Sequence, residues 1–442
     1  RGYLRSLLLM IDSYPAVAMN PPYMGSRQMN SNLKSYTKEH YPDSKRDLFA
    51  VFMEVGEEGI ESAGRLGMIN QQSWMFLSSF EDLRTNILDT TVIESMLHLG
   101  ANTFDEISGE VVQSTSFVLR NALPQGRTGT YFRLVDENSS TAKKETFEVG
   151  EYRYTGVDQQ DFKKIPGSPT AYWANPNLLE TFSTAPKLKE EADLKQGIKT
   201  GNNSRFLRMW PEVSMRAFEH DASSCPEALN STKKWFPIVK GGGYRKWYGN
   251  HEFVLDWEEN GTSIKNFTVS DGNLRSRPQN LEYFFRGGIT WSKISSDKSS
   301  FRHVPKGFAF ESNGPMCFVN KGNEYEKISL LNSKVTTYIL SILAPTIEFG
   351  EGSLGRLPTV QGGEKTRSRA SECIRLSKRD YDSREISWNF TQHPLVKQNA
   401  ASLEAAYDAW TEQATDDFFQ LHANEEELNE LFIDLYGLED DL

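Results

Sequence analysis

The sequence predicts an α/β fold for its first part, a mixed, β-rich module for its middle and an acidic helix at its end. Up to about residue 135, short apolar runs alternate with helical patterns, which is typical of a doubly wound sheet with helices on its faces. From about Gly197, short aromatic runs alternate with Gly, Asn and Lys/Arg, which indicates irregular β-structure. We therefore expect an α/β domain over 1–135, a connector over 136–194, a β-rich domain over 195–400 and an acidic helical segment over 401–442.

The α/β pattern can be followed element by element. A Leu-rich helix is predicted from Gly2 to Tyr14, and Pro15 ends it. The apolar run Ala16–Met19 is typical of a buried strand. The further predicted elements are helices over 47–60, 80–88 and 330–343, and strands over 65–70, 92–99, 111–119 and 130–135.

Composition excludes several classes of protein. None of the apolar runs among the 442 residues approaches the ~18–20 needed to span a bilayer, so no membrane partner is expected. Three widely spaced cysteines exclude a disulfide framework and a CxxC metal clip. His220 and Cys225 lie close together, but two candidate ligands do not make a zinc site. We expect no metal and a reducing, cytoplasmic location.

Charge is unevenly distributed along the chain, whose formal net charge is −11. Residues 195–306 contain 18 Lys/Arg against 11 Asp/Glu, whereas residues 401–442 contain 13 Asp/Glu and no Lys/Arg. The basic stretch is either a nucleic-acid contact or a solvated face. Apolar residues at helical spacing from Asn424 to Phe432 predict an amphipathic helix, which we expect to pack on a neighbouring domain or on the basic face.

One motif carries chemistry: Asn20, Pro21, Pro22 and Tyr23, directly after the predicted strand. A strand followed by a proline turn needs no function, but ligands of open α/β sheets bind beyond the carboxyl ends of strands. The Asn20 side-chain oxygen and the next main-chain carbonyl can accept both hydrogens of an exocyclic amine. Tyr23 can stack on an extruded base. These residue types point to methylation of such an amine, without a nucleophile or general base.

This motif resembles that of the amino-methyltransferases acting on adenine N6. Its surroundings, Asn20-Pro21-Pro22-Tyr23-Met24-Gly25-Ser26, resemble the PglX-type adenine-specific DNA methyltransferases of BREX phage-defence systems. Further matching stretches are 41–45, 47–52, 72–79, 109–113, 234–237, 245–250, 275–280, 288–293, 331–335 and 424–429. The resemblance covers nearly the whole chain.

The resemblance implies site-specific transfer of a methyl group from S-adenosylmethionine to a flipped adenine in double-stranded DNA. It implies a partial Rossmann-like class I methyltransferase domain over 1–135, in which Asp47 and Phe49 line the cofactor pocket; the alternative is that they cap and fill a helix. The Gly-rich cofactor turn of this family does not occur in Arg1–Met19. We therefore expect an internal fragment with the base-binding half of the catalytic domain.

The resemblance also makes the basic middle a target-recognition domain, and other phage-defence proteins are possible partners. Lys/Arg contact phosphates, and Arg, Lys, Asn and Gln read base edges. The predicted DNA-contacting residues are Lys199, Asn202, Arg205, Arg208, Lys240, Arg245, Lys246, Arg275, Arg277 and Lys293. Gly241–Gly243 is either a phosphate loop or a plain turn, and Trp235, Trp247 and Trp291 are expected in the core rather than on bases. The alternative function is a non-catalytic DNA-recognition module or specificity subunit.

Overall fold

A computed structural model describes residues 12–104, 112–269, 271–294, 298–344 and 349–442. The chain divides into two compact units, unit 1 over Arg1–Ser183 and unit 2 over Thr184–Leu442. The sequence placed the boundaries at 135 and 195 instead, so the structure assigns most of the expected connector to unit 1.

Unit 1 is built on a six-stranded mixed sheet with strand order β1-β2-β4-β3-β5-β6. Strands β1, β2, β3 and β5 are parallel to one another, while β4 runs antiparallel between β2 and β3 and β6 runs antiparallel to β5. The strands are β1 (Tyr14–Met19), β2 (Ile60–Gln71), β3 (Val92–Gly100), β4 (Ser114–Arg120), β5 (Gly129–Arg133) and β6 (Arg153–Val157).

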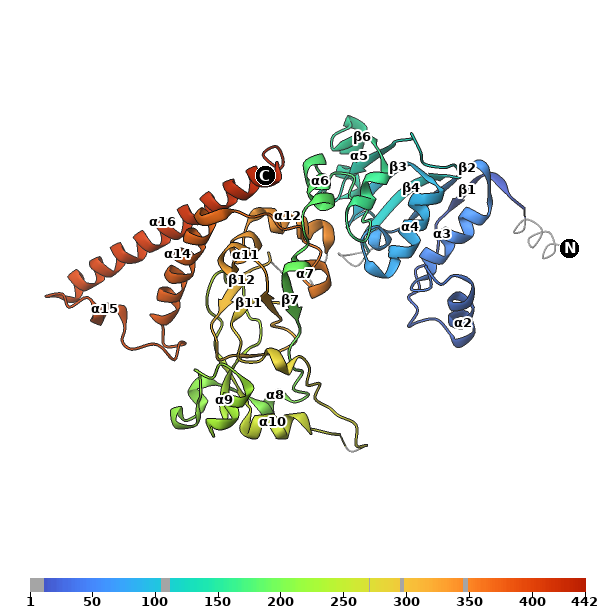
Figure 1. Ribbon diagram of the computed structural model, residues 1–442. Helices are drawn as coiled ribbons and strands as arrows, with labels where there is room; N and C mark the ends of the chain where they lie inside the picture. Colours follow the sequence, from blue (N-terminus) through green and yellow to red (C-terminus); the bar gives the residue numbers. More distant parts are fainter. Residues whose placement is uncertain (1–11, 105–111, 270, 295–297, 345–348) are drawn as a thin grey trace. The chain divides into compact units, whose positions relative to one another are not determined.

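Helices α3 (Leu48–Glu58) and α4 (Glu81–Thr90) pack on this sheet (Figure 1). Helix α3 begins where Asp47 accepts a hydrogen bond from the Phe49 main chain, and its Phe49 and Met53 side chains are buried against β2 residues such as Leu66. Burial of these apolar side chains is the main stabilising contribution. Unit 1 also contains α2 (Ser31–His40), α5 (Ser140–Val149), α6 (Pro176–Thr184) and the 3-10 turns Gln72–Met75, Ser78–Phe80 and Gln159–Lys164.

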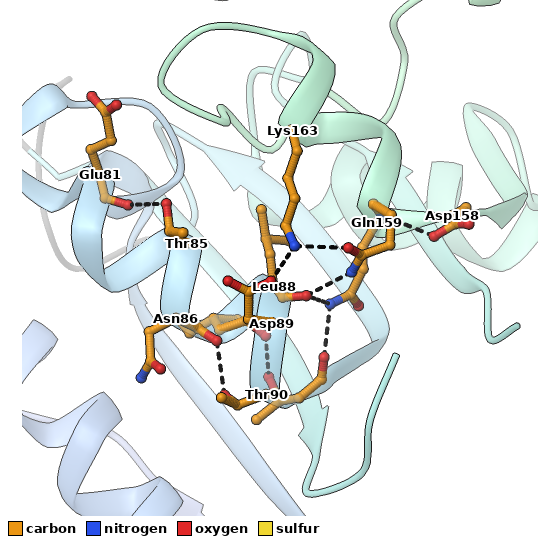
Figure 2. A network of polar contacts seen from close by, with 12 residues as sticks. Glu81, Thr85, Asn86, Leu88, Asp89, Thr90, Asp158, Gln159 and Lys163 are labelled. Carbon is orange, nitrogen blue, oxygen red and sulfur yellow. Dashed lines mark hydrogen bonds and ion pairs between the residues drawn. The ribbon is translucent and has the colours of Figure 1, made fainter. Parts of the chain in front are cut away.

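The segment after β6 is bound to the end of α4, as Figure 2 shows. The Gln159 amide donates to the Thr91 carbonyl at 2.7 Å and accepts from the Ile93 main-chain nitrogen at 2.8 Å. Lys163 forms an ion pair with Asp89 and lies 2.8 Å from the Gln160 amide oxygen. A buried polar side chain that reaches three main-chain groups ties its segment firmly to the fold, so this stretch is part of unit 1 and not a linker.

Other local differences have physical reasons. Strand β1 extends the predicted Ala16–Met19, yet Ala16 and Ala18 are exposed because β1 lies at one edge of the described sheet. The predicted helix over 330–343 is two helices, because the first ends at Leu331 with Asn332 as its C-cap, and Ser333 accepts from the Thr336 main chain as the N-cap of the second. The helix predicted from Gly2 to Tyr14 lies mostly outside the described residues; of its last three residues, Asp12 and Ser13 are not helical and Tyr14 begins β1.

Unit 2 contains two four-stranded sheets, with strand orders β13-β9-β10-β8 and β12-β11-β14-β7. Its strands are β7 (Ala192–Lys195), β8 (Leu207–Met209), β9 (Trp235–Val239), β10 (Phe253–Asp256), β11 (Gly288–Trp291), β12 (Phe301–Val304), β13 (Ala309–Phe310) and β14 (Met316–Val319). Trp247 and Trp291 are buried in this unit, each 1% exposed, which confirms their expected place in the core, whereas Trp235 at the start of β9 is only partly buried.

The helices of unit 2 follow mostly after the strands. They are α7 (Leu188–Glu191), α8 (Asn203–Phe206), α9 (Cys225–Asn230), α10 (Glu258–Lys265), α11 (Glu324–Leu331), α12 (Lys334–Leu343), α13 (Glu351–Leu354), α14 (Gly363–Asp382), α15 (Pro394–Lys397) and α16 (Leu403–Tyr436). The long α16 packs along α14, and α12 and α15 also contact it (Figure 1). Its Leu428, Phe432 and Tyr436 side chains are buried.

The acidic residues of α16 form ion pairs with basic residues of the same unit. Glu425 pairs with Lys246 at 3.0 Å, and Glu426 pairs with Lys334 at 3.1 Å. Glu427 pairs with Lys365 and Arg369, and Asp417 pairs with Arg379. The charge contrast seen in the sequence is therefore partly neutralised inside unit 2. Among the described helices, none has the length and apolar content that crossing a membrane requires.

Candidate functional site

The carboxyl ends of the parallel strands in unit 1 meet at one edge of the sheet. Met19 pairs with Met68 in register, so the residues after β1 lie beside the end of β2. The antiparallel β4 begins at this edge, where Ser114 pairs with Gln71 and Gly100. Because ligands of open α/β sheets bind at this edge, the site is described from the loop that follows β1.

That loop is the predicted motif. Asn20 leaves β1 with an exposed side chain, Pro21 is buried and Pro22 is exposed. The Tyr23 ring is partly buried and meets the Phe49 ring edge-on, with centroids 6.1 Å apart and an interplanar angle of 80°. Phe49 in turn contacts Phe80 at 5.6 Å. These ring contacts with the aromatic core hold the Tyr23 side chain in position, while the Asn20 side chain stays accessible to solvent.

Asp47 joins the motif loop to helix α3. Its Oδ1 atom accepts from the Met24 main chain at 2.9 Å and from the Phe49 main chain at 3.4 Å. A short antiparallel contact adds main-chain hydrogen bonds from Leu48 to Met24 and from Ser26 to Arg46. Burial raises the pKa of the Asp47 carboxyl, while the main-chain donors lower it. Asp47 is thus a helix cap and a loop anchor at once.

The loop borders an open hollow of about 480 Å³. Its lining combines an aromatic ring, a carboxylate, two guanidinium groups and amides: Tyr23, Gly25, Ser26, Arg27, Gln28, Arg46, Asp47 and Gln71. Burial raises the pKa of the Tyr23 phenol, and the nearby Asp47 carboxylate acts in the same direction. Tyr23 therefore stays neutral at physiological pH and offers an uncharged ring face, which suits stacking on a base. Phe49 is only 1% exposed and does not line this hollow.

A buried histidine near the same edge of the sheet was not predicted from the sequence. His98, near the end of β3, is buried, with its Nδ1 atom 3.1 Å from the Tyr172 hydroxyl and its Nε2 atom 2.9 Å from the Gln72 amide oxygen. Gln72 donates to Gln113 at 2.6 Å. Burial lowers the pKa of His98 to about 3, and Arg133 acts in the same direction. A single His in a predicted strand gives no signal, because Gln72, Gln113 and Tyr172 are distant in sequence.

In unit 2 the structure brings four of the predicted DNA-contacting residues together. Lys199 and Arg277 exchange main-chain hydrogen bonds of 3.1 and 2.8 Å. The guanidinium groups of Arg205 and Arg275 both lie on the Phe267 ring, 4.9 and 5.8 Å from its centre. Each of the four is exposed, and none forms an ion pair with another described residue. Lys199, Arg205, Arg275 and Arg277 are called the basic cluster below.

Three further predicted residues lie in the same unit with partly exposed side chains. Lys240 follows β9, and its ammonium group lies 4.5 Å from the centre of the Phe253 ring. Asn202 caps α8 by accepting from the Arg205 main chain at 3.1 Å. Arg208 donates to the Ser204 and Leu207 carbonyls at 2.6 and 2.7 Å. Each of these three side chains is therefore held by a contact within unit 2.

The remaining predicted DNA-contacting residues have other neighbours. Arg245 forms an ion pair with Asp380 at 2.7 Å, and Lys246 forms the ion pair with Glu425. Lys293 joins Asn313 and Phe349 through its main chain. The carbonyls of Gly242 and Gly243 accept from Ser292 at 2.8 Å and from Asn250 at 2.9 Å. The Gly242 and Gly243 carbonyls are therefore bonded within unit 2, and the side chains of Arg245 and Lys246 are paired with carboxylates of the same unit.

Among the described residues, no group of three or more His, Cys, Asp or Glu side chains is arranged to hold a metal ion. Cys317 and Cys373 are buried, and Cys225 is partly exposed. Burial raises the pKa of Cys373 to about 12, so this thiol stays protonated and is unreactive at physiological pH.

Comparison with known proteins adds the family context. The family described as Eco57I restriction-modification methylase matches residues 11–104, which include the motif loop and α3. The adenine-specific methyltransferase PglX of Lacticaseibacillus casei (strain Zhang) is 40% identical over 457 aligned positions, covering 100% of this chain and 38% of that protein. The adenine-specific methyltransferase BrxX of Escherichia coli O9:H4 (strain HS) is 36% identical, covering 98% of this chain and 35% of that protein.

These matches confirm the resemblance to PglX-type adenine-specific methyltransferases that the sequence motifs indicated. The chain spans well under half the length of either curated relative. The solved structure of the Type IIL restriction-modification enzyme MmeI in complex with DNA has the same fold over 96% of this chain and 54% of its own, with a TM-score of 0.53 and 10% identity.

Proposed function

We propose that this chain supplies the base-binding edge and the DNA-recognition unit of an N6-adenine DNA methyltransferase of a BREX phage-defence system. The observation that carries the proposal is the placement of Asn20–Tyr23 at the carboxyl edge of the parallel strands, anchored to α3 through Asp47. The relatives with 36% and 40% identity are named adenine-specific methyltransferases, which supports the same chemistry here.

The motif loop would bind the adenine in two ways. The exposed Asn20 side-chain oxygen and the main-chain carbonyl of Pro21 would each accept one hydrogen of the N6 amine. Two acceptors draw the nitrogen lone pair out of conjugation with the ring, so that it can attack a methyl group. The neutral Tyr23 ring would stack on the adenine, which must leave the duplex before its N6 atom is accessible.

S-adenosylmethionine would supply the electrophilic methyl group and would leave as S-adenosylhomocysteine when the bond between its sulfur and the methyl carbon breaks. The methylated nitrogen would then lose one proton to solvent. The open hollow beside the motif loop suits part of an S-adenosylmethionine molecule in volume and in polar lining. The Asp47 carboxylate lines this hollow. Phe49 would act from behind, by holding Tyr23 in place through the edge-on ring contact. Of the two proposed cofactor residues, we infer that Asp47 would contact the cofactor directly, because it lines the hollow and Phe49 does not.

DNA would be bound by unit 2 through the basic cluster. Exposed, unpaired guanidinium and ammonium groups exchange their counterions for phosphates, which gives a steep dependence of affinity on salt. Lys240, Arg208, Asn202 and Lys293 are proposed to add contacts near the same surface. Arg245 and Lys246 are proposed to stabilise unit 2 instead, because their partners Asp380 and Glu425 already occupy them.

The test uses labelled S-adenosylmethionine and unmodified genomic DNA, followed by digestion to nucleosides and a count of N6-methyladenine. We expect label in adenine with the unchanged chain and none with Asn20→Ala, whose DNA affinity stays within about twofold. Asn32→Ala, an exposed asparagine on α2, is the matched control and should retain transfer. If Asn20→Ala loses transfer and DNA binding equally, the assigned role of Asn20 is wrong.

A second candidate function is a DNA-recognition module without catalysis. The exposed basic cluster of unit 2 supports it, because contacts with phosphates need no methyl-transfer chemistry. DNA binding without any label in adenine, and without binding of S-adenosylmethionine in calorimetry, would identify this function.

A further inference from the structure

Two arginines border the open hollow beside the motif loop. Arg27 and Arg46 are exposed and also line the hollow, so their side chains lie at its open side. Neither side chain has an ion-pair or hydrogen-bond partner among the described residues. The lining also holds the carboxylate of Asp47, whose Oδ1 atom already accepts from two main-chain nitrogens. The hollow therefore opens beside two positive charges that no described carboxylate pairs with.

The main chain holds these two arginines on neighbouring segments. An antiparallel bridge at Gly25 joins the segments, and the Ser26 nitrogen donates to the Arg46 carbonyl at 2.8 Å. Arg27 follows in a turn that is closed by a hydrogen bond of 2.8 Å from the Gln28 nitrogen to the Gly25 carbonyl. The backbone positions of both arginines are thus set by the same loop that carries the motif.

We propose that Arg27 and Arg46 form a phosphate-binding pair, which holds the DNA backbone on either side of the flipped adenine. The inference rests on the proposed function, in which the adenine stacks on Tyr23. Tyr23 lines the same hollow and precedes Arg27 by four residues. Because each internal nucleotide of a strand is flanked by two phosphates, a base bound at Tyr23 brings two phosphates to the opening of the hollow.

Guanidinium groups suit this task. Each presents planar N–H donors that bind a phosphate in a bidentate way. Extruding a base costs free energy of unstacking and unpairing, and phosphate contacts that form only after extrusion offset part of that cost. The pair therefore favours the extruded state, whereas contacts between unit 2 and the duplex would form whether the adenine is stacked or flipped.

The experiment compares two duplexes of the same sequence, one of which carries an additional unpaired adenine. This adenine is extruded more easily, because it has no pairing to lose. The affinity of the full chain for each duplex is measured by fluorescence anisotropy at several salt concentrations, without a methyl donor. Contacts common to both duplexes cancel in the comparison, so the difference reports on the adenine site.

The variants are Arg27→Ala/Arg46→Ala, Arg27→Lys/Arg46→Lys and Tyr23→Ala, with thermal unfolding measured for each. Both arginine pairs change exposed side chains, so their unfolding temperatures should match that of the unchanged chain. The matched control is Arg127→Ala. Arg127 is another exposed arginine of unit 1, but it lies just before β5 and hence at the opposite edge of the sheet.

We expect the unchanged chain to prefer the duplex with the unpaired adenine by roughly fivefold to a hundredfold, from stacking of one base. Its log affinity for that duplex should also fall more steeply with log salt, by about 2, since each phosphate contact contributes about 0.9. Arg27→Ala/Arg46→Ala should lose this additional slope, whereas the lysine pair should keep it because both charges remain. Tyr23→Ala should lower the preference, and Arg127→Ala should behave like the unchanged chain.

The results that would overturn the inference differ from those that would overturn the proposed function. If Arg27→Ala/Arg46→Ala keeps the additional slope while the preference still depends on Tyr23, the adenine site stands without the arginines. If the alanine pair flattens the salt response of both duplexes equally, the arginines are general DNA contacts and not a pair at the flipped nucleotide.

Two further results complete the test. If the alanine pair keeps the additional slope but weakens binding of S-adenosylmethionine in calorimetry, the two guanidinium groups bind the carboxylate of the cofactor, and the inference is wrong. If the unchanged chain shows no preference for the unpaired adenine, the proposed adenine site at Tyr23 fails, and the inference fails with it.

Discussion

The Oδ1 atom of Asp47 lies 2.9 Å from the main-chain nitrogen of Met24, 23 residues earlier in the chain. The same atom caps α3 through Phe49 at 3.4 Å. One carboxylate oxygen therefore fixes both the start of a helix and the end of the motif loop. The orientation of Asn20–Tyr23 relative to the sheet depends on this residue.

Asp47→Ala should lower the free energy of unfolding of unit 1 by about 1–2 kcal/mol, because it removes an N-cap and the Met24 acceptor. Asp47→Asn keeps a side-chain oxygen and should remain within about 0.5 kcal/mol of the unchanged chain. Urea denaturation monitored by fluorescence measures both. Ser139→Ala is the control, since it removes the cap of α5 without touching the motif loop; it should cost stability and leave methyl transfer unaltered. Equal losses in Asp47→Ala and Asp47→Asn would show that charge, not capping, is what the site needs.

The double variant Arg275→Ala/Arg277→Ala should weaken DNA binding and reduce the slope of log affinity against log salt by about 2, since each phosphate contact contributes about 0.9. Filter binding or fluorescence anisotropy at several salt concentrations gives the slope. Lys246→Ala provides the comparison, because Lys246 is paired with Glu425. Its slope should stay unchanged. A salt slope that responds to Lys246 and not to the arginines would place the DNA on a different face of unit 2.

Phe432→Ala should destabilise unit 2 by about 3–5 kcal/mol, because this α16 side chain is 0% exposed and its removal leaves a cavity. Phe419→Ala changes the same residue type on the same helix at a position that is 62% exposed. That variant should remain within about 0.5 kcal/mol of the unchanged chain. Chemical denaturation of both variants measures the difference. Similar small effects in the two would mean that α16 does not contribute its apolar face to the core of unit 2.

Glu57 should make the stability of unit 1 fall as pH rises from about 4.5 to 7. Burial raises the pKa of this α3 carboxyl to about 7, and Glu54 adds to the shift. A raised carboxyl pKa means that the folded state binds the proton more tightly, so its stabilising contribution is present below pH 4.5 and lost above pH 7. Glu57→Gln should therefore stabilise the protein by roughly 2 kcal/mol at pH 8 and by little at pH 4.

Denaturation curves at these two pH values test the assignment. Glu58→Gln is the matched control, because Glu58 is the exposed neighbour of Glu57 on the same helix; its effect should be small at both pH values. A Glu57→Gln benefit that is as large at pH 4 as at pH 8 would contradict the role of ionisation.

Several features could be predicted from the sequence because they depend on local patterns. Alternating apolar runs gave the strands ending at Met19, Gln71 and Gly100 and the helix that begins after Asp47. The motif Asn20–Tyr23 led to the proposed chemistry, since its residue types match the hydrogen-bonding needs of an amine and the stacking of a base. Lys199, Arg205, Arg275 and Arg277 were predicted as DNA contacts by residue type alone, and only the structure shows that they lie close together.

Other features were decided only by the tertiary structure, because they depend on residues far apart in sequence. The segment 153–164 belongs to unit 1 since β6 adds to the sheet and Gln159 binds the end of α4; its short, half-exposed strand has no apolar pattern to reveal this. Lys246 and Arg277 look alike in sequence, yet the fold places Glu425 against the first, 179 residues away, and leaves the second exposed. Periodicity and residue type thus predicted the elements and suggested the proposed chemistry, whereas chain packing determined which charged side chains are paired and which are exposed.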